Sequence, residues 1–223
     1  MKYPNFNEER KLWRRGYKIV VGLDEVGRGP LAGPVVATAV CFKYDRNRVS
    51  IETRFRGVKD SKQLTPKKRE ELYKILTAHP QIKWGIGRVG EKVIDRINIL
   101  EATKLAIKRA VKNLEKKFQK GLLQKSSDRT NFATSSFLLI DGNFGINLNL
   151  PLKSIIKADE KVFSVAAASI LAKVTRDKMM INYHKKYPQY FFAQHKGYPT
   201  ELHRKMLRKY GFCKIHRKSF KVS

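Results

Sequence analysis

Three apolar segments of the chain each run directly into acidic residues, and this pattern limits the folds that the chain can adopt. Residues 19–23 precede Asp24 and Glu25, residues 137–140 precede Asp141, and a short segment around 154–157 precedes Asp159. β-Branched and apolar runs of this length are typical of buried strands. In a layered α/β sheet, functional sites gather at strand ends. If the three strands are neighbours, we expect the four acids to meet at one end of the sheet.

Helix signals separate these strands along the chain. Thr65-Pro66 is a cap followed by a first-turn proline, and Asn98 with Glu101 resembles a capping box. Predicted helices cover residues 5–15, 66–78, a long stretch from 98 to about 118, 165–187, and a last segment between Thr200 and Gly211. Further strands are predicted at 35–42 and 82–86, and residues 119–136 are predicted to be an exposed loop. Strands and helices mixed along one chain predict an α/β fold with a mixed sheet.

The charge of the chain indicates a polyanionic partner. Lys and Arg total 48 against 19 Asp and Glu, a formal net charge of +29. Nucleic acid is favoured over an anionic membrane, because the sequence has no clear amphipathic anchor and no apolar run near the ~18 residues of a membrane helix. Residues 1–15 are too charged for a signal peptide, and only Cys41 and Cys213 are present, without metal or redox spacing. We therefore expect a reduced, cytoplasmic setting.

Each acid has an ordinary explanation when it is considered by itself. Asp141 could belong to an Asp-Gly turn, Asp159 could cap the following helix, and Asp24 and Glu25 could be solvated. Together they are harder to dismiss, because each carboxylate pair at ~4 Å repels by about 4 kcal/mol at an effective dielectric near 20. A hard divalent cation, Mg²⁺ or Mn²⁺, would neutralise such a group. In a strongly basic chain, this combination indicates phosphoryl transfer on a nucleic acid, with two ions as one arrangement.

One long motif resembles the signature of the ribonuclease HII family. It is GLDEVGRGPLAGP at residues 22–34. Further matches follow in the family's order: DSK at 60–62, RINILEAT at 96–103, LIDGN at 139–143, AAASILAKVTRD at 166–177, HKGY at 195–198 and HRKSF at 216–220. The resemblance therefore spans residues 17–222.

The resemblance implies a ribonuclease H-like fold, a mixed central sheet flanked by helices with a helical C-terminal extension. Residues 1–187 would form the catalytic domain, and residues 188–223 the extension packed on it. It implies Asp24, Glu25, Asp141 and Asp159 as catalytic acids that hold Mg²⁺ or Mn²⁺. The expected reaction is hydrolysis of RNA in RNA–DNA hybrids and incision 5′ of ribonucleotides embedded in duplex DNA, leaving 3′-hydroxyl and 5′-phosphate ends. The expected protein is a monomer with no membrane partner.

The resemblance also assigns substrate contacts. The segment Gly27, Arg28, Gly29 and the tyrosine Tyr198 would recognise the ribose, whose 2′-hydroxyl distinguishes RNA from DNA. Ser61, Lys62 and Lys173 would contact phosphates, while Asp177 is expected to support structure by pairing with a basic neighbour. Two departures from the family pattern are Ala158, where a glycine is usual before the fourth acid, and the length of the segment 119–136.

Three other classes of protein share some of these features. A basic RNA-binding protein, such as a ribosome-associated one, explains the charge but not acids at three strand ends. Ribonuclease HIII shares the fold but lacks the arginine of the Gly-Arg-Gly segment and carries an N-terminal domain. A transposase- or resolvase-like nuclease shares the acids but not the ribose-sensing motifs.

Overall fold

A five-stranded mixed sheet forms the centre of the computed structural model, which describes residues 3–42, 55, 57–122, 131–142 and 145–222. Its order is β3-β2-β1-β4-β5. The β1–β2 and β2–β3 pairs are antiparallel, and the β1–β4 and β4–β5 pairs are parallel. The strands are β1 (Ile19–Val26), β2 (Val35–Phe42), β3 (Ile82–Val89), β4 (Ser136–Asp141) and β5 (Leu152–Ile155). The prediction of a mixed α/β sheet is therefore confirmed.

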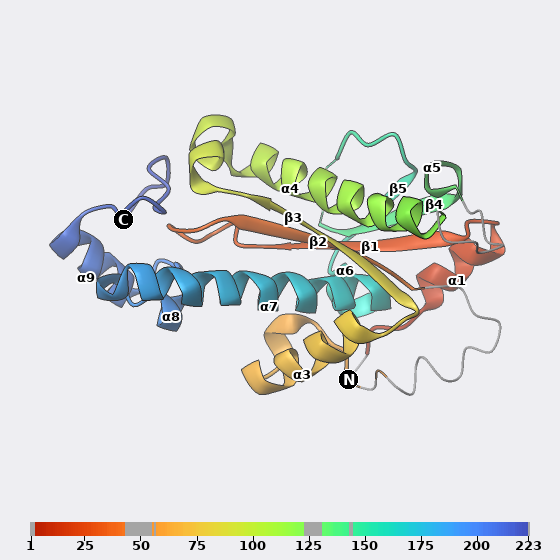
Figure 1. Ribbon diagram of the computed structural model, residues 1–223, viewed down its shortest axis with the longest axis horizontal. Coiled ribbons are helices and arrows are strands. Elements are labelled where there is room, and N and C mark those ends of the chain that lie inside the picture. Colours follow the sequence, from red (N-terminus) through yellow and green to blue (C-terminus); the bar gives the residue numbers. More distant parts are fainter. Residues whose placement is uncertain (1–2, 43–54, 56, 123–130, 143–144, 223) are drawn as a thin grey trace.

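Helices cover both faces of this sheet (Figure 1). The helices are α1 (Asn7–Arg14), α3 (Pro66–Ala78), α4 (Glu91–Leu122), α5 (Phe132–Ser135), α6 (Ala158–Lys161), α7 (Phe163–Lys186), α8 (Phe192–His195) and α9 (Glu201–Tyr210), with 3-10 turns η1 (Ser61–Gln63) and η2 (Pro188–Tyr190). Helix α4 lies along one face, and α7 with α3 along the other. In the described part of the chain, no helix is long and apolar enough to cross a membrane.

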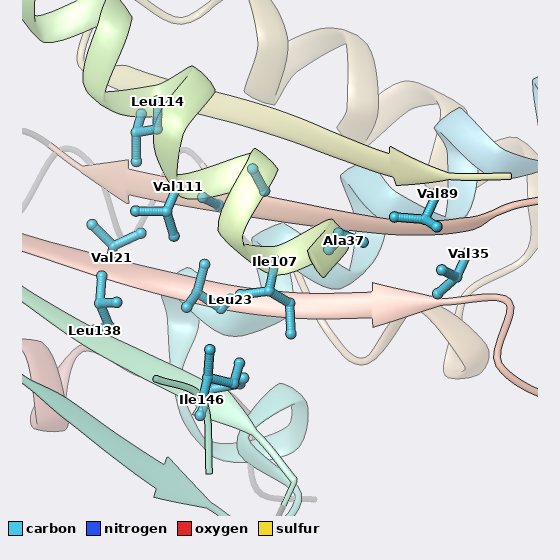
Figure 2. Close-up of a cluster of buried hydrophobic side chains, with 14 of the residues drawn as sticks. Val21, Leu23, Val35, Ala37, Val89, Ile107, Val111, Leu114, Leu138 and Ile146 are labelled. Carbon is cyan, nitrogen blue, oxygen red and sulfur yellow. The ribbon is translucent and has the colours of Figure 1, made fainter. Parts of the chain in front are cut away.

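The main core lies between the sheet and α4. Alternate residues of β1, β2 and β4 project into it, among them Leu23, Ala37 and Leu138 (Figure 2). Helix α4 contributes Ile107 and Leu114. A strand shows successive side chains to opposite faces, so the remaining residues of the same strands face α7. One face of β1 therefore lies in the apolar core beneath α4, and the other face belongs to the layer that holds the acids.

Glycine permits the close approach of α7 to the centre of the sheet. A Cβ placed on Gly22 would lie 2.2 Å from the carbonyl carbon of Ser164, at the start of α7. No side chain fits at that distance, so only glycine lets the helix pack directly on β1. This contact fixes the position of α7 relative to the strand that ends in Asp24 and Glu25.

The structure tests two predicted boundaries around α4. Helix α4 consists of two helical stretches that meet at a kink at Asn98, whose φ of 61° is non-helical, so the long helix opens after Asn98 as predicted and a further stretch from Glu91 precedes it. The predicted cap is confirmed, since Asn98 Oδ1 accepts the N–H groups of Leu100 and Glu101 at 2.9 and 3.1 Å. The predicted loop at 119–136 is partly wrong, because α4 continues to Leu122 and α5 precedes β4, while residues 123–130 lie outside the described residues.

The C-terminal segments pack mainly on the far end of α7 (Figure 1), and Phe220 also reaches the main core. Their apolar cluster joins Met180 of α7 to Phe192 of α8, Leu207 of α9 and Ile215. Helix α9 begins with the predicted cap, Thr200 Oγ1 accepting from the His203 N–H, and ends at the predicted Gly211. Leu31 belongs to the same cluster, so these segments hold the loop that connects β1 and β2.

Candidate active site

Asp24 and Asp141 lie at level positions on adjacent parallel strands. The register of β1 with β4 aligns Leu23 with Ile140, so the next residue of each strand is also level. Leu23 and Ile140 point into the core beneath α4. By alternation, Asp24 and Asp141 point to the opposite face, which α7 covers. Asp141 ends β4 as predicted, whereas β1 continues two residues beyond Asp24, to Val26.

Asp24 is buried beside other negative charges. Its side chain is 7% exposed and accepts a hydrogen bond from Ser169 of α7. Burial raises the pKa of Asp24 well above its ordinary value, and the charges of Glu25, Asp141 and Asp159 raise it further. A carboxylate in this position carries unfavourable energy that a cation would relieve.

Glu25 follows at the end of β1 and is partly compensated by Arg28. Burial raises the pKa of Glu25, whereas Arg28, whose Nη1 lies 3.4 Å from Oε1, lowers it. Asp141 raises the pKa of Glu25 as well. The second oxygen, Oε2, is buried and has no hydrogen-bond partner among the described residues. A buried carboxylate oxygen without a partner is an available ligand.

Asp159 reaches the site from a different element than the sequence predicted. Strand β5 ends at Ile155, Lys157 adopts a left-handed conformation, and Asp159 lies in the short helix α6. The prediction that a strand leads into Asp159 is therefore wrong, although the residue is buried beside the other acids. Burial, Asp141 and Asp60 raise the pKa of Asp159 to about 6, while Lys62, with Nζ 3.8 Å from Oδ2, lowers it.

The connection between β4 and α6 is held by Asp141 itself. Asp141 Oδ1 accepts the Ala158 N–H at 2.7 Å. Ala158 is fully buried, and its methyl group is small enough to fit at this position. This bond brings the residue before Asp159 to the end of β4 and so joins the third and fourth acids.

These four carboxylates fit a hard divalent cation by their chemistry. They supply only oxygen donors, and the charges of neighbouring acids help to raise the pKa of Asp24, Glu25 and Asp159. Over the described residues, no three or more acidic, histidine or cysteine side chains stand close enough together to form a metal site as they are placed. Arg28, Lys62 and the Ala158 N–H contact the carboxylates at the distances given above. The site is thus a partly buried cluster of carboxylates whose donor chemistry suits a hard divalent cation.

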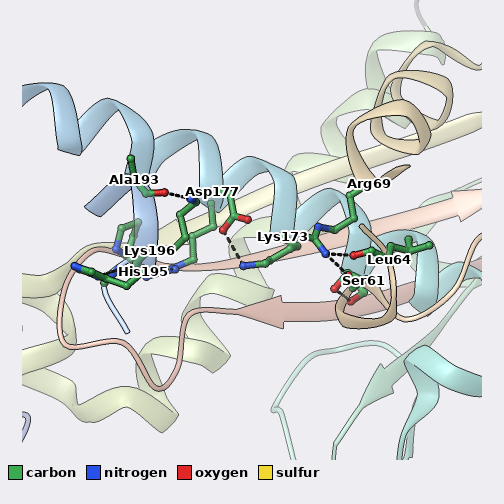
Figure 3. A network of polar contacts seen from close by, with 12 residues as sticks. Ser61, Leu64, Arg69, Lys173, Asp177, Ala193, His195 and Lys196 are labelled. Atoms are coloured by element: carbon green, nitrogen blue, oxygen red, sulfur yellow. Dashed lines mark hydrogen bonds and ion pairs between the residues drawn. The ribbon is translucent and has the colours of Figure 1, made fainter. Parts of the chain in front are cut away.

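The residues predicted to contact phosphates border this cluster. Lys62 is exposed beside Asp159, and the Ser61 hydroxyl bonds the Ser169 hydroxyl at 2.8 Å. Lys173 Nζ is held by Asp177 Oδ1 at 2.9 Å, so the predicted structural role of Asp177 is confirmed (Figure 3). Arg69 donates to the carbonyl oxygens of Ser61 and Leu64 and shapes the turn η1 (Figure 3).

The structure brings the two predicted ribose-contacting segments together. A Cβ placed on Gly29 would lie 4.0 Å from a ring carbon of Tyr198, its nearest neighbour. The Leu31 N–H donates to the Gly197 carbonyl at 2.8 Å and ties the segments by their backbones. Tyr198 is 37% exposed, so its ring presents a free surface next to the Gly27–Gly29 loop.

Several residues of this site received no role from the sequence. Asp60 lies beside Asp159 and caps η1 by accepting the Lys62 N–H at 3.0 Å. Ser169 connects Asp24 with Ser61. Both stand inside the motifs DSK and AAASILAKVTRD, which is the only signal that could have indicated them. Asn143, which follows the third acid in its motif, lies outside the described residues.

The chain is similar to known proteins along nearly its whole length. The family model described as Ribonuclease HII matches residues 21–223. A ribonuclease HII from Acetivibrio thermocellus is 47% identical over 212 residues, which cover 95% of this chain and 73% of that relative. The crystal structure of ribonuclease H2 from Pyrococcus horikoshii OT3 matches with a TM-score of 0.65 and 29% identity, covering 92% of this chain and 94% of that one.

A more distant structure extends the comparison to the fold alone. Bst-RNase HIII in complex with Mn²⁺ matches with a TM-score of 0.56 and 19% identity, covering 90% of this chain and 65% of that one. The mixed sheet with helices on both faces is therefore a ribonuclease H-like fold, as predicted.

Proposed function

The chain belongs to the ribonuclease HII family, and from that premise we propose that it incises duplex DNA on the 5′ side of an embedded ribonucleotide by two-metal-ion catalysis. Membership makes it a ribonuclease H, an endonuclease that acts on RNA–DNA hybrids. The proposed products are a 3′-hydroxyl and a 5′-phosphate. The observation that carries the proposal is the acidic cluster, in which neighbouring acids help to raise the pKa of Asp24 and Asp159, in a chain of net charge +29.

Asp24, Glu25, Asp141 and Asp159 are the proposed metal ligands. When bound there, two Mg²⁺ or Mn²⁺ ions supply positive charge that activates a water molecule and stabilises the leaving oxygen. The distant relative Bst-RNase HIII was crystallised with Mn²⁺, which supports this choice of ion. The carboxylates contribute charge and position, and Ser169 keeps Asp24 oriented by its hydrogen bond.

Ser61, Lys62 and Lys173 are proposed to bind the phosphates on either side of the cut. Lys62 is exposed and adjacent to Asp159, so a phosphate can approach both Lys62 and the acidic cluster. Lys173 is held in one position by Asp177, which favours a defined contact over a mobile one. Phosphate contacts position the duplex but carry no information about the sugar.

Recognition of the ribose is proposed for the backbone of Gly27, Arg28 and Gly29 together with Tyr198. A site built to bond a hydroxyl rejects the analogue that lacks it, because its own polar groups are left unpaired. The ring of Tyr198 lies 4.0 Å from the position that a Cβ on Gly29 would occupy, and this proximity supports one shared nucleotide for both segments.

The test is cleavage of a DNA duplex that contains one ribonucleotide, with Mg²⁺, Mn²⁺ or a chelator. We expect wild-type protein to cut once, 5′ of the ribonucleotide, only when a metal is present. Asp24→Asn and Asp141→Asn should each abolish cleavage, because they remove ligand charge with little change of shape. Both variants should still bind the duplex, since affinity rests mainly on lysine and arginine.

Glu160→Gln is the matched control for these neutralising substitutions. Glu160 follows Asp159 in α6, but its Oε1 lies 3.8 Å from Lys157 Nζ, in a surface ion pair. This variant should cleave at the wild-type rate. Cleavage in the presence of chelator, or substantial cleavage by Asp24→Asn at saturating Mg²⁺, would contradict the proposed mechanism.

A further inference from the structure

Two fully buried arginines hold the loop between β1 and β2. Arg176 of α7 and Arg217 of the C-terminal segment are each 0% exposed. Neither has a carboxylate within ion-pair distance among the described residues, and both guanidinium groups donate to backbone carbonyls instead. A buried charge is costly unless it is fully hydrogen-bonded, so each arginine needs the surrounding carbonyls in defined positions. The carbonyls in turn depend on the arginines, whose N–H groups hold them in their orientation.

Arg217 collects three carbonyls of this one loop. Its Nη1 donates to the Arg28 carbonyl at 2.9 Å, and Nη2 donates to that of Gly27 at 2.6 Å. The Gly33 carbonyl accepts from both Nε and Nη2, at 3.0 and 2.8 Å. A guanidinium is planar and rigid, with donors in fixed directions. Arg217 therefore sets the relative orientation of both ends of the loop.

Arg176 connects the same loop to the segment that carries Tyr198. It donates to the carbonyls of Pro34, Ala32 and Lys196 at 2.9, 3.1 and 3.0 Å. Its guanidinium carbon lies 5.8 Å from the centre of the Tyr198 ring. The Arg176 side chain also occupies the space beside Gly27, where a Cβ would lie 2.3 Å from Nε. One side chain thus contacts both segments proposed to bind the ribose.

The two carbonyls held by Arg217 determine where the following N–H groups point. In a trans peptide, the C=O and the next N–H lie on opposite sides of the bond, and the described chain contains no cis peptide. Because the carbonyls of Gly27 and Arg28 are turned toward the buried Arg217, the N–H groups of Arg28 and Gly29 are directed away from it. They are therefore presented on the side of the loop opposite the buried guanidinium.

The C-terminal segment that carries Arg217 is itself firmly attached. The Gly33 N–H donates to the Ile215 carbonyl, and the Arg217 N–H donates to the Leu31 carbonyl, each at 2.8 Å. Beyond Arg217, Asp95 of α4 accepts the N–H groups of Lys218 and Ser219, each at 3.0 Å. The arginine is therefore anchored on both sides of its own position.

We infer that Arg217 and Arg176 are positioning residues for recognition of the ribose: their guanidinium groups hold the Gly27–Gly29 backbone so that its N–H groups face the sugar. This inference rests on the proposed function, since it names the supports of the same site. It makes the C-terminal segment part of substrate selection, although Arg217 does not touch the substrate.

The experiment compares Arg217→Lys and Arg176→Lys with wild-type protein. Lysine keeps the charge but has one nitrogen, which cannot bridge carbonyls that a guanidinium spans. We expect kcat/KM on a duplex with one ribonucleotide to fall by about tenfold or more, the effect of losing about one well-placed hydrogen bond. The inhibition constant of an all-DNA duplex of the same sequence, used as competitor, should stay within about twofold, because phosphate contacts are retained.

Hydrogen exchange of the free protein gives a second readout that does not depend on activity. Amides of residues 27–33 should exchange faster in both variants. The matched control is Arg109→Lys, since Arg109 also donates to a backbone carbonyl, that of Arg88 on β3 at 2.6 Å, and not to a carbonyl of the loop. That variant loses a bond to a β3 carbonyl and none to a carbonyl of residues 27–34, so it should change neither the kinetics nor exchange in the loop.

The outcomes separate this inference from the proposed function. If wild-type protein does not cut at the ribonucleotide, the proposed function fails, and hydrogen exchange alone decides whether the arginines order the loop. If wild-type protein cuts but both variants keep its kcat/KM or its loop exchange, the inference is overturned. Loss of the fold in both variants, measured by thermal melting, would also overturn it, because the arginines would then support the whole domain.

Discussion

Protonation of a buried histidine pair should destabilise the protein at mildly acidic pH. The Cys213 N–H donates to His216 Nδ1 at 2.9 Å, so a neutral His216 carries its proton on Nε2. That nitrogen lies 3.0 Å from His203 Nε2, which must then accept. His203 consequently carries its proton on Nδ1, 2.9 Å from the Tyr198 carbonyl. A directed chain of hydrogen bonds thus ends at the backbone of Tyr198.

This chain requires both histidines to be neutral. Burial lowers the pKa of His203 to about 4, and burial together with His203 lowers the pKa of His216 to about 4. The unfolded chain takes up these protons near the ordinary histidine pKa of about 6.5. Because the folded-state pKa is the lower one, the stabilising contribution is complete above about pH 6.5 and is lost as the pH falls toward 4.

The loss is large enough to measure. For one histidine with these two pKa values, the free energy of unfolding falls by about 2 kcal/mol between pH 7.5 and pH 5. The second histidine adds less than the same amount, because the two sites share one hydrogen bond. The reduction is therefore about 2–4 kcal/mol, a sizeable part of the stability of a typical domain.

Urea unfolding of wild-type protein and His216→Gln at both pH values measures this contribution. The variant should be less stable at pH 7.5, because the hydrogen-bonded chain is broken. The difference should shrink by about 2 kcal/mol at pH 5, since the variant lacks the titrating group. His184→Gln, on α7 and outside this pair, controls for loss of a histidine as such. An equal difference between wild type and His216→Gln at both pH values would refute the reasoning.

Two further predictions concern Tyr198 and a buried acid near the N-terminus. Tyr198→Ala should reduce cleavage at a single ribonucleotide far more than it weakens duplex binding. Tyr198→Phe keeps the ring and removes the hydroxyl, so the two variants together separate the roles of these groups. A wild-type cleavage rate for the alanine variant would make Tyr198 a packing residue. Glu9 is buried, accepts the Ser164 N–H at 2.8 Å and has its pKa raised to about 7 by burial. Because the folded-state pKa is raised, the free energy of unfolding falls as the pH rises from about 4.5 to about 7. Glu9→Gln removes this titrating group, so urea unfolding at pH 8 should show a free energy of unfolding higher by up to about 3 kcal/mol. No increase would contradict this assignment.

Local signals in the sequence determined most of the elements. Strand β2 has the predicted limits, and the helix caps Thr65, Asn98 and Thr200 all accept the expected backbone N–H groups. These features depend on neighbours within a few residues, so the sequence pattern contains them. That Asp24 and Asp141 each follow an apolar strand segment is also visible in the sequence, whereas their level positions depend on the parallel pairing of β1 with β4.

The tertiary structure decided what no local pattern contains. A helical stretch from Glu91 precedes the predicted long helix and meets it at Asn98, whose φ of 61° interrupts the helix there. Asp159 reaches the acidic cluster through α6 and the bond between Asp141 and the Ala158 N–H, not through a strand. The sequence also does not indicate the roles of Arg176 and Arg217. Their partners are backbone carbonyls, which every residue has, so no side-chain pattern in the sequence marks the loop that they hold.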